Sequence, residues 1–391
     1  MSIYISFTNL YKYKRKELKK KFMDNTKIGN VSAIFLIVTI MINNIILNIP
    51  KSILRTSESS APLNIIYISI LAILLTLLIC KLFKKFPGSD ILDVSNFLFG
   101  KWFKFIIGLL FIIYLLSTSS VLLRDFSEGL KIIYFRRTQI YFIIALFIIV
   151  AAFTNILGEK SIIRSNLLIL PLVLIGIIFI FVANIKNFVP QRIFPILGDG
   201  VNSTFITGTS NLYAFSCLFL IYFIPPYLKN TSSFKKVAVT SIVISAIYLF
   251  VCIFSLICMF SFITQENEIM PIYLVSRYIE FGTFFQRVDA IFFFIWILEV
   301  SLYLNVVIML TIRIFKKITN IESSSTMIYP ICLLLFCFAL IPKNLADINL
   351  FNETFYKNIT LYFVIITSLI ILILANIKNK IKNKNKEEVL T

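Results

Sequence analysis

The stretch VSAIFLIVTIMINNIILNIPKS, residues 31–52, is apolar over the length of a membrane helix except near its middle. Asn43 and Asn44 stand side by side there, Asn48 follows one turn later, and Pro50 ends the apolar run. About 20 apolar residues suffice to cross a bilayer. Amides in that environment need hydrogen-bond partners, and proline removes a backbone donor. We therefore expect a membrane helix that is interrupted near its centre.

Composition extends this reading to the whole chain. Of its 391 residues, 59% are hydrophobic and 15% are charged, with a mean hydropathy of +0.91. A soluble protein of this length needs a more polar surface. We predict an all-α polytopic membrane protein. The net charge of +19 comes from Lys and Arg in short runs between apolar stretches, which is where membrane topology places them, so a nucleic-acid partner is not expected.

The residue types that are missing exclude several kinds of chemistry. The chain has no histidine, so it has no His-based triad, proton relay or H-E-x-x-H metal site. No G-x-x-x-x-G-K-[ST] phosphate loop occurs. The six cysteines lie in or at the ends of apolar stretches, and none forms a C-x-x-C pair. We therefore expect neither an enzyme nor a metal or cofactor site.

Hydropathy predicts about ten membrane helices. They cover approximately residues 30–50, 62–82, 103–126, 138–156, 163–184, 208–228, 237–261, 288–313, 326–342 and 358–377. Two further segments have an amphipathic or interfacial pattern. One is residues 90–103, before the third span, and the other is residues 271–285, before the eighth.

The basic residues predict the orientation and the domain plan. Most of the 38 Lys and Arg fall on one side of the membrane if both termini are cytoplasmic. Basic tails, 1–28 and 378–391, flank one transmembrane domain, 29–377, with halves of about 29–185 and 206–377. Five spans in each half place the second half in the membrane upside down, as in inverted-repeat transporters.

In such transporters the first helix of each half is often broken. The sixth span, FITGTSNLYAFSCLFLIYFIPPYLK, has a polar entry at residues 208–211, small residues at Ser216 and Cys217, and an exit broken by Pro225 and Pro226. Two interrupted helices at corresponding places predict a ligand site between them. The alternative for Asn43 and Asn44 is that they hydrogen-bond to neighbouring helices as packing contacts.

The third span is unusually polar in its second half. Tyr114 and Thr118 lie among serines there, and Arg124 and Glu128 follow. The spacing of four residues lets Arg124 and Glu128 pair on one face of a helix. We interpret them as an ion pair or a gate near the outer surface.

Glu299 stands inside RVDAIFFFIWILEVSLYLN, residues 287–305, where it shares a helix face with Trp296 and Tyr303. A carboxylate at bilayer depth costs at least roughly 2.5 kcal/mol and is a functional-site hypothesis by default. It could serve as a cation or proton site, or contact the ammonium group of a ligand. The alternative is a protonated side chain hydrogen-bonded to a neighbouring helix.

Several local patterns, in this order, resemble the B-subunit permeases of bacterial spore germinant receptors, within the amino acid–polyamine–organocation transporter superfamily. The resemblance covers about residues 25–380. The patterns are Pro50 followed by a basic residue, FGKWFKFIIGLLFIIYLL with the Arg124 and Glu128 pair, GEKSIIR with Gly158 and Arg164, FPIL before the sixth span, Pro225 at its end, and FFQRVDAIFFFIW with Arg287, Asp289 and Trp296.

The resemblance implies a LeuT-like fold, a 5+5 inverted repeat in which helices 1 and 6 are broken. It implies a subunit in the spore inner membrane that binds a small germinant, usually an amino acid. It also implies assembly with a larger A-subunit membrane protein and a C-subunit lipoprotein. The implied ligand-binding residues are Asn43, Asn44, Ile45, Tyr114, Thr118, Ser216, Cys217, Glu299, Leu302 and Tyr303. The implied structural or gating residues are Arg124, Glu128, Arg164, Arg287 and Asp289.

The chain departs from the family pattern in two places. The Asn43–Asn44 pair replaces a glycine-rich break in the first helix, and Cys217 replaces the glycine of a Gly-Glu pair in the sixth. Glu299 is a candidate to compensate for the missing glutamate. Three functions remain open: a receptor subunit that binds a germinant without moving it, an ion- or proton-coupled amino-acid transporter, and a scaffold that binds no ligand.

Overall fold

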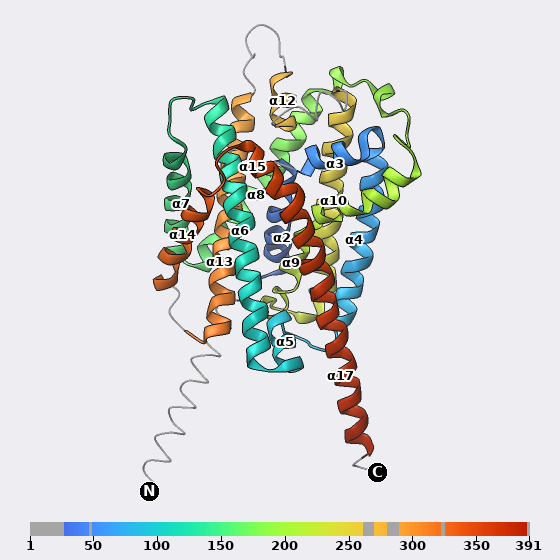
Figure 1. Cartoon of the computed structure of the whole chain (residues 1–391), viewed down its shortest axis with the longest axis vertical. Helices are drawn as coiled ribbons and strands as arrows, with labels where there is room; N and C mark the ends of the chain where they lie inside the picture. The colour runs from blue at the N-terminus through green and yellow to red at the C-terminus, as the bar shows by residue number, and fades with distance from the viewer. Residues whose placement is uncertain (1–26, 47–48, 261–269, 280–288, 322–324, 389–391) are drawn as a thin grey trace.

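The computed structural model describes residues 27–46, 49–260, 270–279, 289–321 and 325–388. Its long helices lie side by side along one axis, with α5 at one end of the bundle and α12 at the other (Figure 1). The α-helices are α2 (Asn30–Ile46), α3 (Ile49–Ser57), α4 (Ala61–Phe83), α5 (Ile91–Phe99), α6 (Lys101–Ile133), α7 (Ile140–Ile156), α8 (Glu159–Ala183), α9 (Leu218–Ile221), α10 (Phe234–Met259), α12 (Pro271–Arg277), α13 (Asp289–Thr319), α14 (Ser325–Ala339), α15 (Leu345–Leu350), α16 (Lys357–Ile359) and α17 (Ser368–Glu388).

Short 3₁₀-helical and π-helical segments lie between these α-helices. The 3₁₀ helices are Glu58–Ser60, Ile185–Asn187, Pro190–Ile193, Thr207–Phe215, Pro225–Tyr227 and Thr231–Ser233, and the π-helices are Asn202–Ile206, Phe351–Tyr356 and Thr360–Thr367. The described residues hold no named strand, and one isolated bridge joins Ile28 to Leu228.

The prediction of an all-α membrane protein is confirmed. Within the described ranges, six helical runs are long and apolar enough to cross a membrane: Ile49–Phe83, Lys101–Ile133, Glu159–Ala183, Thr231–Met259, Asp289–Thr319 and Leu345–Asn383. Shorter apolar helices are Asn30–Ile46, Ile140–Ile156 and Thr326–Ala339. Large apolar side chains such as Phe153, Leu168 and Ile175 are exposed on the outside of the bundle, as a surface facing lipid requires.

The last span begins earlier than the sequence indicated. Its helix starts at Leu345, whereas hydropathy placed the start at about residue 358. The backbone N–H of Asp347 donates to the Asn344 side chain at 2.9 Å, and the backbone N–H of Lys343 donates to the Asp347 side chain at 3.0 Å. The first bond caps one free donor of the first turn, and the second holds the residue before the N-cap in place, so a polar segment becomes the first turns of the helix.

Both interrupted helices are present. In the first span the described part of α2 extends to Ile46 and that of α3 runs from Ile49, and the two helices lie at an angle to each other (Figure 1). In the sixth span the 3₁₀ helix Thr207–Phe215 precedes α9, which has four residues. Irregular backbone at membrane depth is tolerated only inside protein or along a cavity.

Asn211 fixes the irregular half of the sixth span against its neighbours. Its buried amide nitrogen lies 2.8 Å from the Thr56 hydroxyl and 2.9 Å from the Asn64 side-chain oxygen. A Cβ atom at Gly208 would lie 2.2 Å from the Asn64 amide nitrogen. Glycine at this position therefore lets the sixth span approach α4 closely.

Charged contacts tie the spans together at the α5 end. Lys317 of α13 donates to both Asp90 and Asp93 at 2.6 Å, and the same two carboxylates cap the start of α5. Arg313, one turn away, makes two hydrogen bonds to Glu159 of α8, at 2.9 and 2.7 Å. Fork-like pairs of this kind combine charge with fixed geometry.

The first and sixth spans join this arrangement. The Arg313 guanidinium lies 4.0 Å from the centre of the Tyr227 ring. The Ile28 backbone N–H donates to the Tyr227 carbonyl at 2.7 Å, and the Lys229 N–H donates to the Ile28 carbonyl at 3.1 Å. The first, fifth, sixth and eighth spans are therefore held together at the α5 end.

We expect Arg313→Gln to lower the free energy of unfolding by about 2 kcal/mol, because it leaves Glu159 unpaired. Fully buried pairs cost more when broken, but the Glu159 side chain is 32% exposed. Thermal unfolding of the purified protein in detergent, followed by tryptophan fluorescence, measures the change. Arg136→Gln, at an exposed arginine, is the control and should change stability by about 0.5 kcal/mol or less. Equal melting temperatures for both variants would contradict the stabilising role.

Candidate functional site

A small cavity lies where the two interrupted spans meet the last span. It has a volume of about 30 Å³ and is lined by side chains from α2, α3, α6, α13, the 3₁₀ helix Thr207–Phe215 and the first turns of the last span. That volume is roughly the space of one water molecule in the liquid. A nutrient could enter only after side chains in the wall move apart.

Three polar side chains, two of them buried and Tyr356 half-buried, join the spans around this cavity. The Asn44 amide donates to the Ser216 hydroxyl at 3.1 Å and lies 3.3 Å from the Tyr356 hydroxyl. The Tyr356 hydroxyl in turn donates to Ser216 at 2.9 Å. Asn44 belongs to the first span, Ser216 to the break in the sixth and Tyr356 to the last span. Each of these side chains provides a hydrogen-bond partner for the other two, and together they link the three irregular segments.

The last span contributes a polar face that the sequence analysis missed. Asn349, Asn352, Glu353 and Tyr356 all line the cavity. Their spacing of three or four residues places them on one side of a helix, and three of them lie in the π-helix Phe351–Tyr356. Such π segments in helices are frequent at functional sites. The spacing was visible in the sequence, but only if the helix was expected to start at residue 345.

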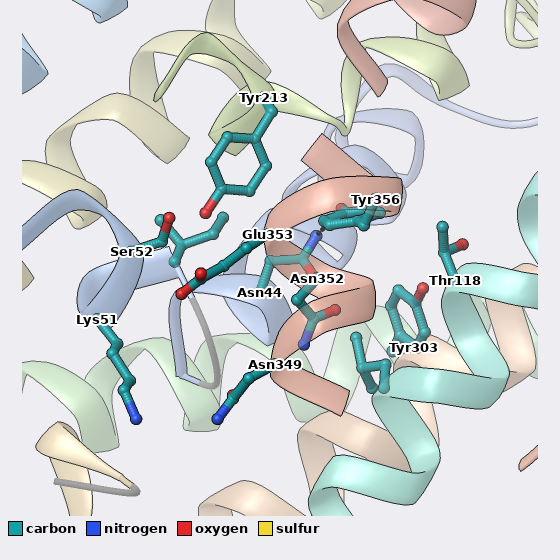
Figure 2. Close-up of a pocket in the computed structure, with 12 residues that line it drawn as sticks. Asn44, Lys51, Ser52, Thr118, Tyr213, Tyr303, Asn349, Asn352, Glu353 and Tyr356 are labelled. Atoms are coloured by element: carbon teal, nitrogen blue, oxygen red, sulfur yellow. Dashed lines mark hydrogen bonds between the residues drawn. The ribbon is translucent and has the colours of Figure 1, made fainter. Parts of the chain in front are cut away.

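The cavity carries one cationic and one anionic side chain among its described lining residues, Lys51 and Glu353. Lys51 and Glu353 lie toward the α3 side of the cavity, and Thr118 and Tyr303 lie on the opposite side (Figure 2). Glu353 also pairs with Arg55 of α3. The site therefore holds charges of both signs beside hydroxyl and amide groups.

Aromatic rings form much of the remaining wall. The rings of Tyr213 and Tyr356 meet edge to face with their centres 5.9 Å apart. Tyr114 lies beside the site and shares a hydrogen bond of 3.2 Å with Thr360. The Thr118 hydroxyl donates to the Tyr114 carbonyl of its own helix at 2.7 Å. Tyrosine side chains therefore border the cavity on several sides.

The ten residues predicted to bind ligand divide into three groups. Asn44, Thr118 and Tyr303 line the cavity. Ser216 and Tyr114 lie next to it through hydrogen bonds to Tyr356 and Thr360. The remaining five are buried but are absent from its wall: Asn43, Ile45, Cys217, Glu299 and Leu302.

Glu299 lies one helical turn from the cavity, since Tyr303, four residues later, lines it. Its side chain is fully buried, and neither carboxylate oxygen has a hydrogen-bond partner among the described residues. Trp296, on the same face, packs edge to face on Phe126 with ring centres 4.6 Å apart. The surroundings of Glu299 are thus largely apolar.

The predicted gating residues are spread along the bundle. Arg124 pairs with Glu128 at 2.8 Å and donates to the Lys343 carbonyl at 3.2 Å, which ties α6 to the start of the last span. Asp289 begins α13, and its backbone carbonyl accepts from the Tyr134 hydroxyl at 3.4 Å. Arg164 lies away from the cavity around Tyr356, in the wall of a second cavity at the α5 end of the bundle. Arg287 lies outside the described residues.

The two adjacent asparagines should respond oppositely to replacement by leucine. Neither side-chain amide atom of Asn43 has a partner in the described chain, so Asn43→Leu removes a buried polar group that costs about 1–3 kcal/mol. It should leave the melting temperature unchanged or raise it. Asn44→Leu deprives Ser216 and Tyr356 of a partner and should destabilise by about 1–2 kcal/mol. Equal destabilisation by both changes would show that Asn43 has a partner of its own.

Known proteins resemble the chain over most of its length. The profile of the spore permease family, described as spore germination protein, matches residues 27–348. Spore germination protein YndE of Bacillus subtilis is 22% identical over 357 residues, which are 87% of this chain and 94% of that protein. Spore germination protein A2 of the same organism is 20% identical, over 84% of this chain and 90% of its own.

Solved structures agree with the fold. A sodium-coupled sialic acid symporter in a substrate-bound outward-open state has a TM-score of 0.60 at 11% identity, over 88% of this chain and 80% of that one. MhsT in complex with L-phenylalanine has a TM-score of 0.62 at 12% identity, over 88% and 87%. These likenesses confirm the predicted LeuT-like architecture. The family match over most of the chain shows that this protein is an integral membrane protein of the spore germination permease family.

Proposed function

We propose that this permease binds a small zwitterionic nutrient, an amino acid, in the cavity around Tyr356 and signals spore germination through partner subunits. One observation carries the proposal. The cavity where both interrupted spans meet the last span is lined by a lysine and a glutamate beside tyrosine and asparagine side chains. An amino acid carries both charges and needs complementary groups for each.

The charges suggest how the ligand is held. The Lys51 ammonium suits the ligand carboxylate, and the Glu353 carboxylate suits the ligand ammonium, since hydrogen bonds to charged groups are the strong ones. Asn44 and Tyr356 can turn from each other toward the ligand when the cavity opens. Glu299 is one turn away, so in this proposal it does not contact the ligand ammonium.

Signalling would follow from the hydrogen bonds that the ligand displaces. Asn44, Ser216 and Tyr356 link three spans only while the cavity is closed. A ligand that separates them shifts the protein toward a second arrangement of those spans. The partners we propose are a larger A-subunit membrane protein and a C-subunit lipoprotein, and the proposed location is the spore inner membrane.

The proposed orientation places the α5 end in the cytoplasm. Basic residues such as Arg313 and Lys317 lie at that end, and α17 runs to it with a lysine-rich sequence (Figure 1). Cytoplasmic segments carry the excess of Lys and Arg. The nutrient would therefore reach the cavity from the α12 end.

Binding and uptake must be measured separately, with purified protein in liposomes and a labelled panel of amino acids and nucleosides. Saturable binding without uptake supports a receptor subunit. Absence of both signals, with the A- and C-subunits also present, would contradict ligand binding and leave a scaffold.

Ligand analogues test the assignment of the two charges. Lys51→Gln should weaken binding of the amino acid about 10- to 100-fold but change little for its decarboxylated amine, because only the amino acid has a carboxylate. Glu353→Gln should weaken both compounds and change little for an N-acetyl analogue. Lys343→Gln, at an exposed lysine near the start of the last span, is the control for the loss of one positive charge outside the cavity. Uniform losses for all analogues would refute the assignment.

Ion-coupled transport is the second candidate, because α2, α8 and α13 carry buried oxygen atoms without a partner among the described residues. They belong to Asn43, Asn166, Glu299 and Asn305, and the three helices pack against one another. Carbonyl and carboxylate oxygens are ligands for hard cations. Uptake driven by a sodium or proton gradient, and abolished by Glu299→Gln while binding persists, would establish transport in place of sensing alone.

A further inference from the structure

Asn352 differs from the other described residues in the wall of the cavity around Tyr356. It belongs to the π-helix Phe351–Tyr356 of the last span. Its side-chain nitrogen is buried and has no hydrogen-bond partner in the described chain, and of the described lining residues only Asn352 has such an atom. Burial removes the water that would otherwise accept from this donor. The closed cavity therefore leaves Asn352 without the partner that its burial requires.

The neighbouring polar groups already have partners. Tyr356 shares hydrogen bonds with Asn44 and Ser216. The Thr118 hydroxyl donates to a backbone carbonyl of its own helix at 2.7 Å. These contacts do not include Asn352, so within the described chain its amide nitrogen remains available to a ligand.

Asn352 lies between the two sides of the cavity. In Figure 2 it stands between Glu353, which lies toward α3, and Tyr303, which lies on the opposite side. Lys51 also lies toward α3 (Figure 2). In the proposed function Lys51 and Glu353 hold the carboxylate and the ammonium group of the ligand, which are bound to one carbon atom. The side chain of the ligand, bound to that same carbon, then points away from α3 and passes Asn352.

We propose that Asn352 selects amino acids whose side chain carries an oxygen acceptor, in a hydroxyl or an amide group. This inference rests on the proposed function, because it takes Lys51 and Glu353 as the partners of the ligand's two charges. An apolar side chain of the same shape would keep the Asn352 nitrogen buried without a partner. A carboxylate side chain would bring a second negative charge near Glu353, and Lys51 is the one cation among the described lining residues.

The expected preference follows from that one hydrogen bond. A site that hydrogen-bonds a group of its substrate discriminates strongly against analogues that lack the group, whereas an apolar pocket discriminates weakly. Leaving a buried donor unpaired corresponds to about tenfold in affinity or more. Threonine and valine have the same shape, and asparagine and leucine are similar in shape, so the two pairs isolate the effect of the oxygen atom.

The test measures binding of both pairs to the purified full-length protein in liposomes. Wild type should favour the oxygen-bearing member of a pair about tenfold. Asn352→Leu should abolish that preference, mainly by losing affinity for the oxygen-bearing member. Asn358→Leu, at an exposed asparagine of the same span outside the wall, is the control and should keep the wild-type preference. Asn352→Ala replaces Asn352→Leu if the latter does not fold.

The outcomes separate this inference from the proposed function. Binding with equal affinity within each pair, or a preference that survives Asn352→Leu, would overturn the role of Asn352 and leave the nutrient site in place. If no amino acid of a full panel binds wild type, with the partner subunits also present, both proposals are overturned.

A measurement without ligand tests whether the Asn352 amide lacks a partner in the closed protein. Asn352→Leu removes a buried donor that makes no hydrogen bond, so its melting temperature should equal or exceed that of wild type. A lower melting temperature, with Asn358→Leu unchanged, would show that the amide already has a partner and would overturn the proposal.

Discussion

The hydroxyl of Tyr356, shared between Asn44 and Ser216, is the contact on which the arrangement of the bundle's centre depends. Each of the three spans that meet there departs from a straight α-helix: α2 and α3 differ in direction (Figure 1), the sixth span has a turn at Ser216, and the last span has a π-helix around Tyr356. Irregular backbone at membrane depth requires polar partners inside the protein. The side chains that supply those partners also enclose the cavity, so the stability of the breaks and the shape of the proposed nutrient site have one origin.

The two ends of the molecule are held differently. At the α5 end, forked and paired charges join spans that are far apart in sequence, as Arg313 and Glu159 do. At the other end, contacts such as Arg55 with Glu353 and Arg124 with the Lys343 carbonyl attach the last span to α3 and α6. A nutrient that enters beside Glu353 would disturb the second set first. The α5 end would stay closed, which fits a sensor better than a carrier.

The sequence predicted the fold well because hydropathy and interruption are local signals. Apolar length located the spans, and the Asn43–Asn44 pair with Pro50 marked the break in the first. Which of the two asparagines faces the cavity depends on the rotation of α2 about its own axis, and only the structure shows that it is Asn44. The polar residues from Asn349 to Tyr356 lower the hydropathy below that of a span, so four of the twelve residues that line the candidate site, those of the last span, fell outside the predicted spans. Glu299 was the strongest single signal, yet it lies one turn from the cavity, because burial cost alone does not tell which neighbour a carboxylate serves.

The most direct test of the central claim is whether an amino acid occupies the space between α3 and Tyr356. Ser52, in the cavity wall, can be changed to cysteine in a Cys337→Ser background, since Cys337 is the exposed thiol of the described chain. Ser210→Cys, on the 3₁₀ helix Thr207–Phe215 but outside the wall, is the matched control. The measurement is the rate of maleimide labelling with and without each amino acid of a panel. Our account predicts that one amino acid slows labelling at position 52 and leaves position 210 unchanged. Ligand binding that protects neither position would place the site elsewhere and contradict the account.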